Sequence, residues 1–544
     1  MAEGTFVHLS KRFFTFGRQE ADKLAAATFW ATVALVGLVL WGIGATFQRA
    51  WESDVPILLD GAWRVFQGQR PWVDFQTPLG PVTFLIIAGG MKLTGFSTAA
   101  IGHSSALLFV VVSIWAYALS RARMGPWLSL ISGLGAGLTA GGTSCYGFGA
   151  MNITHVGYAA LYNRHGEALT ILVLIECLWP LRNSNRRWQA LFGGLSSGIV
   201  LSLLFFLKIN FFAAALFLIG AMAFVLKYPR NRWLGIITGG LLMSVLMLAY
   251  LRFDFAAIAQ DLTLTVQARG GKLFHDVPRI LSGVPFTLTQ IYLLFLLWWM
   301  TPASNVFGRP WLPPKIRQAF LVGFILVAQL VIFWTCTQTF TPTLFAWAAL
   351  LVLHARSEIS GTTHPGGPPS RTITGSWKPI SMLAAVPIGI VLFTNLASIG
   401  FSAGYRLFQI PNYQGQRFDS TSLADLIANK PYVEKINDGL KLLRAHSRTN
   451  ETILTLDYNN PFSFGLLRPS ARGDLLWWDQ DMTYKKTVRP PADRLFYDTV
   501  LVMVPKDPEV SAVGLPILYQ ADLESRFTRA AESSHWILYR KNVL

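Results

Sequence analysis

Charged residues are scarce in this sequence. Asp, Glu, Lys and Arg make up 14% of the 544 residues, against about 25% in a typical soluble domain. Hydrophobic residues make up 52%, and the mean hydropathy is +0.41. This shortage of charge excludes water as the solvent for most of the chain. Apolar stretches long enough to cross a hydrocarbon core of ~30 Å recur from Ala26 to Gly400. The sequence therefore predicts a polytopic α-helical membrane protein.

Cysteine is scarce in this sequence, and nucleotide-binding motifs are absent from it. The three cysteines, Cys145, Cys177 and Cys336, lie in or beside apolar stretches, and residues 401–544 contain none. That segment therefore cannot hold a disulfide. The chain also has no nucleotide-phosphate loop, dinucleotide fingerprint, nucleophile elbow or zinc-ligand spacing. These absences argue against a nucleotide-driven pump and against nucleotide-sugar chemistry in a cytosolic domain.

The character of the chain changes after residue 400. Residues 401–544 are polar, mixed in charge and interrupted by turn residues. Strand-like runs at 452–456, 499–504 and 536–539 alternate with helical stretches near 421–447 and 521–532. We therefore expect two parts: a multi-span membrane domain over 1–400 and a soluble α/β or α+β domain over 401–544.

The net charge of +17 does not indicate nucleic-acid binding, because the basic residues lie in short loops between apolar stretches. This is the positive-inside pattern of membrane proteins. It predicts about eleven crossings, within a range of ten to thirteen, with the N-terminus inside and the C-terminal domain outside. The N-terminus has no small-residue cleavage site and is expected to stay as a first helix. The expected spans are 26–47, 101–120, 126–142, 167–181, 190–207, 210–226, 232–251, 285–300, 317–337, 340–354 and 379–400.

One further apolar stretch, 79–95, is ambiguous, since it opens with Pro78-Leu79-Gly80-Pro81. If it crossed, every later basic loop would face outside, so we expect that it does not cross. Four segments then share the outer face: 48–80, 143–166, 252–284 and the C-terminal domain. Nearly all polar residues that could take part in catalysis or binding fall in these four segments.

The first outer loop is rich in acids and aromatic residues. From Asp54 to Gln67 its apolar residues have helical spacing, which predicts an amphipathic helix lying on the membrane surface. Gly68 is placed to end that helix. The loop carries Glu52, Asp54, Asp60 and Asp74 together with Arg64 and Arg70. These acids are either ordinary solvated loop residues or parts of a site pressed against the bilayer.

The same loop resembles a family. An acid soon after the first span, an amphipathic stretch ending in Gly, and Arg-Pro-Trp-Val-Asp-Phe followed by Pro-x-x-Pro resemble the first outer loop of GT-C glycosyltransferases. The similar branches are the protein mannosyltransferases and aminoarabinose transferases. These enzymes take sugar from a polyprenyl-phosphate carrier. Phe206-Leu207-Lys208-Ile209-Asn210 is also similar to the Lys-containing break that they carry between two mid-chain spans.

The resemblance implies a catalytic base in the first loop. The family commonly has an Asp-Glu pair there, whereas this chain reads Glu52-Ser53-Asp54, so both acids remain candidates. We favour Asp54, because it stands 14 residues before Gly68, as in the family. Asp74 matches the second acid of the pattern.

Inverting transfer from a sugar phosphate also needs cations for the departing phosphate. The candidates are Arg164, Lys208, Arg269 and Lys272, the last two flanking a Gly-Gly turn. Lys208 interrupts a long apolar run, and its alternative role is a lysine that snorkels to the interface. Residues expected to contact the acceptor or the sugar are Asp60, Arg64, His165 and Asn210.

Metal binding has only a weak basis. His155, His165 and Glu167 match no familiar ligand spacing, and we expect no protein-bound metal site. The resemblance leaves a divalent cation, Mg²⁺ or Mn²⁺, open, because some GT-C enzymes need one and others do not. In the C-terminal domain, segments 457–462 and 477–481 combine aromatic residues with carboxylates. They suit sugar contact, but docking onto the membrane surface or the outer loops is favoured.

The expected partners are a polyprenyl-phosphate sugar donor, the lipid bilayer and an unknown acceptor, without nucleic acid. A transporter or lipid flippase is the main alternative, and it is disfavoured because the spans are nearly free of internal charge apart from Glu176. A non-catalytic scaffold is the third. We expect a bacterial cytoplasmic membrane, while two Asn-x-Thr matches, at Asn152 and Asn450, leave the endoplasmic reticulum open.

Overall fold

The computed structural model describes most of the chain. The described residues are 3–44, 52–142, 144–145, 156–158, 160–178, 187–226, 228–270, 313–335, 389, 392–404, 406 and 415–542. The expected spans 285–300 and 340–354 and the candidate ligand Lys272 lie outside these residues.

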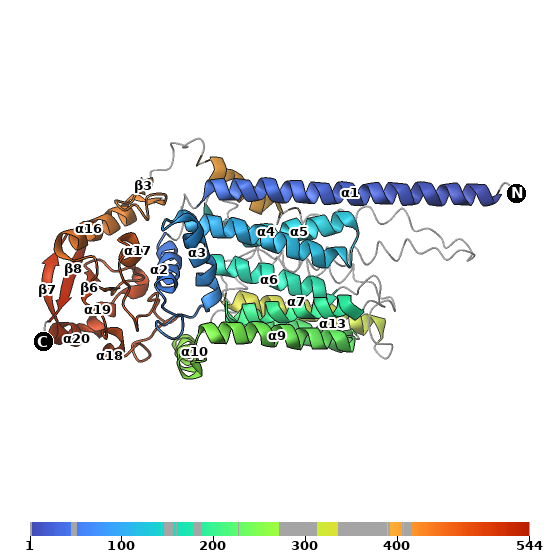
Figure 1. The fold of residues 1–544 in the computed structure, drawn as a ribbon. Coiled ribbons are helices and arrows are strands. Elements are labelled where there is room, and N and C mark those ends of the chain that lie inside the picture. The colour runs from blue at the N-terminus through green and yellow to red at the C-terminus, as the bar shows by residue number, and fades with distance from the viewer. Residues whose placement is uncertain are drawn as a thin grey trace.

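Roughly parallel helices form the first part of the molecule (Figure 1). Within the described residues, four helical segments are long and apolar enough to cross a membrane: Gln19–Ile43, Ala99–Arg121, Arg187–Phe205 and Arg230–Tyr250. The count of eleven crossings stays a prediction. The helices of this bundle are α1 (Glu3–Ile43), α4 (Ala99–Arg121), α5 (Pro126–Gly141), α6 (Leu161–Leu178), α7 (Arg187–Phe205), α8 (Ile209–Val225), α9 (Arg230–Tyr250) and α13 (Pro314–Thr335).

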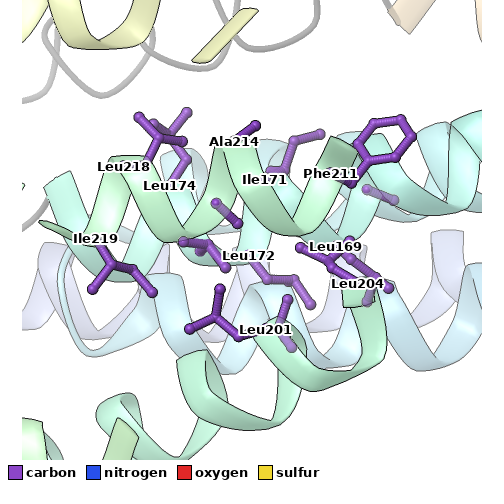
Figure 2. Close-up of a cluster of buried hydrophobic side chains, with 14 of the residues drawn as sticks. Leu169, Ile171, Leu172, Leu174, Leu201, Leu204, Phe211, Ala214, Leu218 and Ile219 are labelled. Atoms are coloured by element: carbon purple, nitrogen blue, oxygen red, sulfur yellow. The ribbon is translucent and has the colours of Figure 1, made fainter. Parts of the chain in front are cut away.

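Two kinds of packing hold the bundle together. Leucine, isoleucine and phenylalanine side chains of α6, α7 and α8 interlock in a buried cluster (Figure 2). Helices α7 and α9 instead meet at small residues, Gly194 and Gly198 against Gly235 and Gly239. A Cβ atom at any of these four glycines would lie 2.1–2.3 Å from a backbone carbonyl oxygen of the other helix. Two GxxxG patterns therefore bring the backbones into direct contact.

Glu176, the acidic residue noted inside a predicted span, is paired with arginines inside the bundle. The carboxylate of Glu176 accepts hydrogen bonds from Arg123 Nη2 at 2.9 Å and from Ser197 Oγ at 3.0 Å. Arg232 pairs with the same carboxylate and donates to the Glu176 carbonyl oxygen at 2.8 Å. All four side chains are buried. Glu176 thus joins helices rather than lining a path through them.

Helices α2 (Asp54–Phe66) and α3 (Pro81–Thr94) lie across one end of the bundle (Figure 1). The helix predicted from Asp54 is present, and Gly68 follows it with φ +84°. The expectation that α2 lies on the membrane surface is wrong, because every residue from Asp54 to Arg64 is buried, between α3 and the C-terminal domain. Helix α3 has 14 residues, about 21 Å at 1.5 Å per residue, which is shorter than a bilayer core.

The C-terminal domain is built on a four-stranded mixed sheet of order β5-β6-β8-β7. Its strands are β5 (Ile453–Thr455), β6 (Leu501–Pro505), β7 (Phe527–Glu532) and β8 (Trp536–Lys541). Strands β5 and β6 are parallel, and the other pairs are antiparallel. The helix expected over 521–532 ends at Arg526, because the residues that follow pair with β8. The domain boundary at 400/401 stays a prediction.

The remaining elements are short, except for two helices. Helix α16 (Lys430–His446) packs on the sheet, and helix α10 (Phe255–Arg269) follows α9 at the end of the bundle that faces the C-terminal domain (Figure 1). The others are β1 (Ser144–Cys145), β2 (Val156–Gly157), β3 (Gly415–Arg417), β4 (Ile427–Asn429), α17 (Phe462–Gly465), α18 (Ala492–Leu495), the 3₁₀ turn η1 (Val510–Ala512), α19 (Leu515–Leu518) and α20 (Gln520–Arg526).

Candidate active site

The first outer loop is bonded to the C-terminal domain through its backbone. Gln76 N donates to Asp474 O at 2.8 Å, and Leu476 N donates to Gln76 O at 2.9 Å, so this part of the loop pairs like a short strand. Beside this pairing, Arg64 donates to Asp60 at 2.8 Å and to Asp474 at 2.7 Å, with all three side chains at most 2% exposed. The docking expected of this domain is therefore present.

The same loop is also bonded to the break between α7 and α8. Gly80 N donates to Leu207 O at 2.9 Å, and Val82 N donates to Phe206 O at 3.0 Å. A Cβ atom on Gly80 would lie 1.9 Å from Phe206 O, so only glycine allows this approach. The loop thereby fixes the carbonyl groups that the helix break leaves without helical partners.

A cleft of about 830 Å³, part of it open to solvent, lies where the loop, the break, α10 and the C-terminal domain meet. It collects three residues singled out from the sequence, Asp54, Lys208 and Arg269. The remaining lining residues are Ile57, Leu58, Pro78, Leu79, Ala160, Tyr162, Asn163, Thr265, Tyr458, Trp477, Asp479, Met482 and Thr483.

Asp54 is the first residue of α2 and is 9% exposed. Its Oδ1 accepts a hydrogen bond of 3.0 Å from the hydroxyl of Tyr458. Among the described residues, no hydrogen bond to Oδ2 is found. Burial raises the pKa of Asp54 to about 6, the Tyr458 hydroxyl lowers it, and the charge of Asp479 raises it further. A carboxylate with a pKa near neutrality suits a general base.

The two cations come from the membrane side of the cleft. Lys208 precedes α8 and donates to Asn163 Oδ1 at 2.9 Å, with its Nζ 5.0 Å from the ring centroid of Tyr162. Arg269 is the last residue of α10 and is half-buried. Both side chains belong to the lining of the cleft, where they offer positive charge to an anionic ligand.

The C-terminal domain contributes the opposite wall of the cleft, with Tyr458, Trp477, Asp479 and Thr483. Segments 457–462 and 477–481 therefore both contribute residues to the cleft lining, and the first also contacts the first outer loop. Asn459 Nδ2 also donates to the Ser53 carbonyl oxygen, directly before Asp54. The roles of Tyr458 and Asp479 as individual residues could not be read from the sequence, since no local pattern places them beside residue 54.

The other acids of the first loop lie outside the cleft lining. Glu52 accepts from Asn429 Nδ2 at 2.8 Å, so of the two candidate bases only Asp54 reaches the cleft. Asp74 pairs with Arg70 Nε at 2.9 Å. Asp60 and Arg64 are held in the buried network with Asp474, and neither lines the cleft.

Three further candidates lie on α6 and α8 without lining the cleft. Arg164 donates to the carbonyl oxygens of Thr139 at 3.1 Å and Leu138 at 3.0 Å, which places its charge at the C-terminus of α5. A cation there is favourable for the helix dipole. His165 and Asn210 are both buried. The roles proposed for them from the sequence stay predictions.

A buried acid that the sequence reading did not single out lies on α10. Asp261 is 2% exposed and accepts from Thr77 N at 3.4 Å. Burial raises its pKa to about 8, and the residue links α10 to the first loop. The sequence did not indicate this burial, because Asp261 lies in a segment that was expected to be an exposed outer loop.

The described residues contain no group of three His, Cys, Asp or Glu side chains that could hold a metal ion. The divalent cation left open by the sequence therefore has no ligand set among them, and it stays a prediction.

The sequence matches no family model and no curated protein. Its structure is similar to that of ArnT from Cupriavidus metallidurans in the apo state, with a TM-score of 0.47 and 13% identity over 94% of this chain and 98% of that one. ArnT bound to undecaprenyl phosphate gives a TM-score of 0.45 at 13% identity, covering 94% of this chain and 97% of that one. The archaeal oligosaccharyltransferase AglB from Archaeoglobus fulgidus, in complex with an inhibitory peptide and a dolichol-phosphate, gives 0.38 at 10% identity, covering 88% and 69%. Both belong to the GT-C superfamily, which the first outer loop resembles.

Proposed function

We propose that this protein is a membrane glycosyltransferase that moves a sugar from a polyprenyl-phosphate-linked donor to an acceptor at the outer face of the membrane. The observation that carries the proposal is the cleft, whose lining brings together Asp54, Lys208 and Arg269. Such a transfer needs a carboxylate that acts as a base toward the acceptor hydroxyl, and cations that stabilise the departing phosphate.

The reaction proceeds as an inverting displacement. Asp54 takes the proton from the acceptor hydroxyl while the acceptor oxygen forms a bond to the anomeric carbon. The bond between that carbon and the phosphate oxygen breaks on the opposite face, and the electron pair leaves with the polyprenyl phosphate. Lys208 and Arg269 stabilise the negative charge of this leaving group. The Tyr458 hydroxyl holds Oδ1 of Asp54, which leaves Oδ2 to receive the proton.

The position of the cleft supports a lipid-linked donor. Its lining residues come from the end of the helix bundle and from the C-terminal domain, which adjoin each other in Figure 1, and a lipid phosphate at the boundary of the bilayer would sit there. With this assignment, the N-terminus is cytoplasmic, residues 401–544 lie outside, and a bacterial cytoplasmic membrane is the proposed location.

The test compares wild type with Asp54→Asn by native mass spectrometry of protein purified in mild detergent. Loss of a general base slows transfer by about 10²–10⁴-fold. The variant should therefore retain the glycosylated donor lipid, whereas wild type should carry the polyprenyl phosphate that remains after transfer. Glu52→Gln is the matched control and should behave like wild type.

If neither protein binds any polyprenyl phosphate, even when it is added in excess, the glycosyltransferase proposal is wrong. If Asp54→Asn carries the same lipid product as wild type, Asp54 is not the base. Lipid flux in proteoliposomes without any sugar transfer would instead support a flippase.

A further inference from the structure

Helix α10 contributes Arg269 to the cleft, although little of the helix is packed. Three of its 15 residues are buried, and Asp261 is one of them. Asp261 accepts the hydrogen bond from Thr77 N at 3.4 Å, which ties the middle of the helix to the first loop. Thr265 and Arg269 follow Asp261 at intervals of four residues, and both line the cleft. The face of α10 that starts at Asp261 therefore continues into the cleft.

The C-terminal domain holds the other end of α10. Lys485 Nζ donates to Gly270 O at 2.5 Å and to Gln267 O at 3.2 Å. The last carbonyl groups of an α-helix lack helical partners, and the helix dipole favours a cation beside them. Arg269 is the last residue of α10 and lies between these two carbonyl groups in the chain. Lys485 therefore fixes the backbone that carries the Arg269 side chain.

The backbone of Lys485 is itself well fixed. Lys485 N donates to Val488 O at 2.8 Å, and Val488 N donates to Lys485 O at 3.1 Å. The preceding residue, Tyr484, is 1% exposed and packs edge-on against Trp478, with 5.4 Å between the ring centroids. Thr483, directly before it, lines the cleft. One short segment of the C-terminal domain thus forms part of the cleft wall and also holds the end of α10.

We propose that Lys485 is a positioning residue for the donor phosphate, which caps the C-terminus of α10 and thereby holds Arg269 in the cleft. This inference rests on the proposed function, which supplies the phosphate that Arg269 binds. Lys485 contacts carbonyl groups of the helix and is outside the cleft lining, so it acts through the helix. A guanidinium on a fixed backbone loses less conformational freedom when it binds a phosphate than one on a frayed helix end.

The test is a double-mutant cycle on the full-length protein in mild detergent, with a radiolabelled short-chain polyprenyl phosphate as the probe. Arg269→Met should weaken binding at least about tenfold, because it removes a charged donor. Lys485→Met should weaken binding about two- to fivefold, as expected for loss of a cation at a helix C-terminus. In the Arg269→Met background, Lys485→Met should change the affinity by less than about 1.5-fold, because the residue that it positions is gone.

Two further variants separate capping from a general effect of charge. Lys485→Arg should keep the wild-type affinity, because a guanidinium also donates to carbonyl oxygens. Lys486→Met is the matched control at the next residue, which is exposed, and it should also bind as wild type does. The buried network of Arg64 docks the C-terminal domain without Lys485, so Lys485→Met should stay folded. Thermal unfolding midpoints establish this for each variant.

Unchanged affinity in Lys485→Met, or an equal loss in Lys486→Met, would overturn the inference. Equal effects of Lys485→Met with and without Arg269 would also overturn it, because Lys485 would then act on the ligand independently. A loss in Lys485→Arg as large as that in Lys485→Met would contradict the capping role. Failure of wild type to bind the polyprenyl phosphate, or wild-type affinity in Arg269→Met, would instead count against the proposed function, so the two failures are distinguishable.

Discussion

Two acids of helix α2, Asp54 and Asp60, both contact the C-terminal domain, and they do so in different ways. Asp54 receives one hydrogen bond from the Tyr458 hydroxyl and lines an open cleft. Asp60 is 1% exposed, pairs with Arg64 at 2.8 Å and accepts from Ser470 Oγ at 2.8 Å. The first has an oxygen left for chemistry, while the second has each oxygen engaged in holding the domain.

The comparison shows how one helix serves docking and chemistry together. The network of Asp60, Arg64 and Asp474 fixes the C-terminal domain against α2, and that contact brings Tyr458 and Asp479 to Asp54. A buried ion network is costly to disrupt because each partner left behind is an uncompensated charge. Changes in the network should therefore act on folding, and changes in the cleft should act on binding and turnover.

The largest effect is expected for Arg64→Met. It leaves Asp60 and Asp474 buried without their cation, and it should destabilise the folded protein by about 3–5 kcal/mol. Unfolding in denaturant, followed by tryptophan fluorescence, measures this loss. Asp54→Asn is the contrasting variant. The pKa of Asp54 is raised to about 6 in the folded protein, so its ionisation lowers stability as the pH rises from about 4 to 6.

Asp54→Asn removes that cost and should be at least as stable as wild type at pH 7. A large loss of stability in Asp54→Asn, or none in Arg64→Met, would erase the distinction between the two acids.

The next effect concerns Lys208. Replacement by Met keeps most of the apolar stem and removes a charged donor worth about 1.5–3 kcal/mol, so the affinity for polyprenyl phosphate should fall roughly 10–100-fold. Equilibrium binding of the radiolabelled lipid measures it. Lys92→Met, at an exposed position on α3, should change nothing. Unchanged affinity in Lys208→Met would assign Lys208 to snorkelling at the interface.

A smaller effect sharpens the role of the C-terminal wall. The rate of transfer should rise through a pH of about 6, because Asp54 acts as a base only when ionised. Tyr458→Phe removes a hydrogen bond that lowers the pKa of Asp54, so the profile should move to higher pH by about one unit. Asp479→Asn removes a charge that raises this pKa, so the profile should move to lower pH. Shifts of the same sign in both variants would contradict the arrangement.

The smallest effect is expected for Glu52→Gln. Glu52 is half-buried, and its carboxylate accepts a hydrogen bond from Asn429 Nδ2, which a glutamine oxygen can also accept. Stability should change by no more than about 0.5 kcal/mol, and the transfer rate should stay within about twofold. Loss of activity comparable to that of Asp54→Asn would move the base to Glu52.

Local pattern predicted much of the fold. Helical spacing placed α2, Gly68 ended it, and the three strand-like runs correspond to β5, β6 and β8. The pattern could not tell that α2 is covered on both sides, because an amphipathic sequence fits a membrane surface as well as a packed interface. In the same way, Phe527–Glu532 becomes a strand through pairing with β8, which is a tertiary contact.

The site was predicted in part for the same reason. Lys208 stood out because it interrupts an apolar run, where a charge is costly, and Asp54 because of its spacing before Gly68. Arg64 and Arg164 were candidates as cations of the outer loops, yet their partners are Asp60, Asp474 and the carbonyl groups of α5. Tyr458 lies 404 residues from Asp54 in the chain, and only the fold brings them together.

The hydrogen bonds from Gly80 and Val82 to the break between α7 and α8 are made by the main chain alone. They fix the distance between the first loop and the helix break that carries Lys208, independently of any side chain. Side-chain changes in the walls of the cleft should therefore leave this spacing intact. A Cβ atom at position 80 would instead meet the carbonyl oxygen of Phe206 at 1.9 Å and force the loop and the break apart.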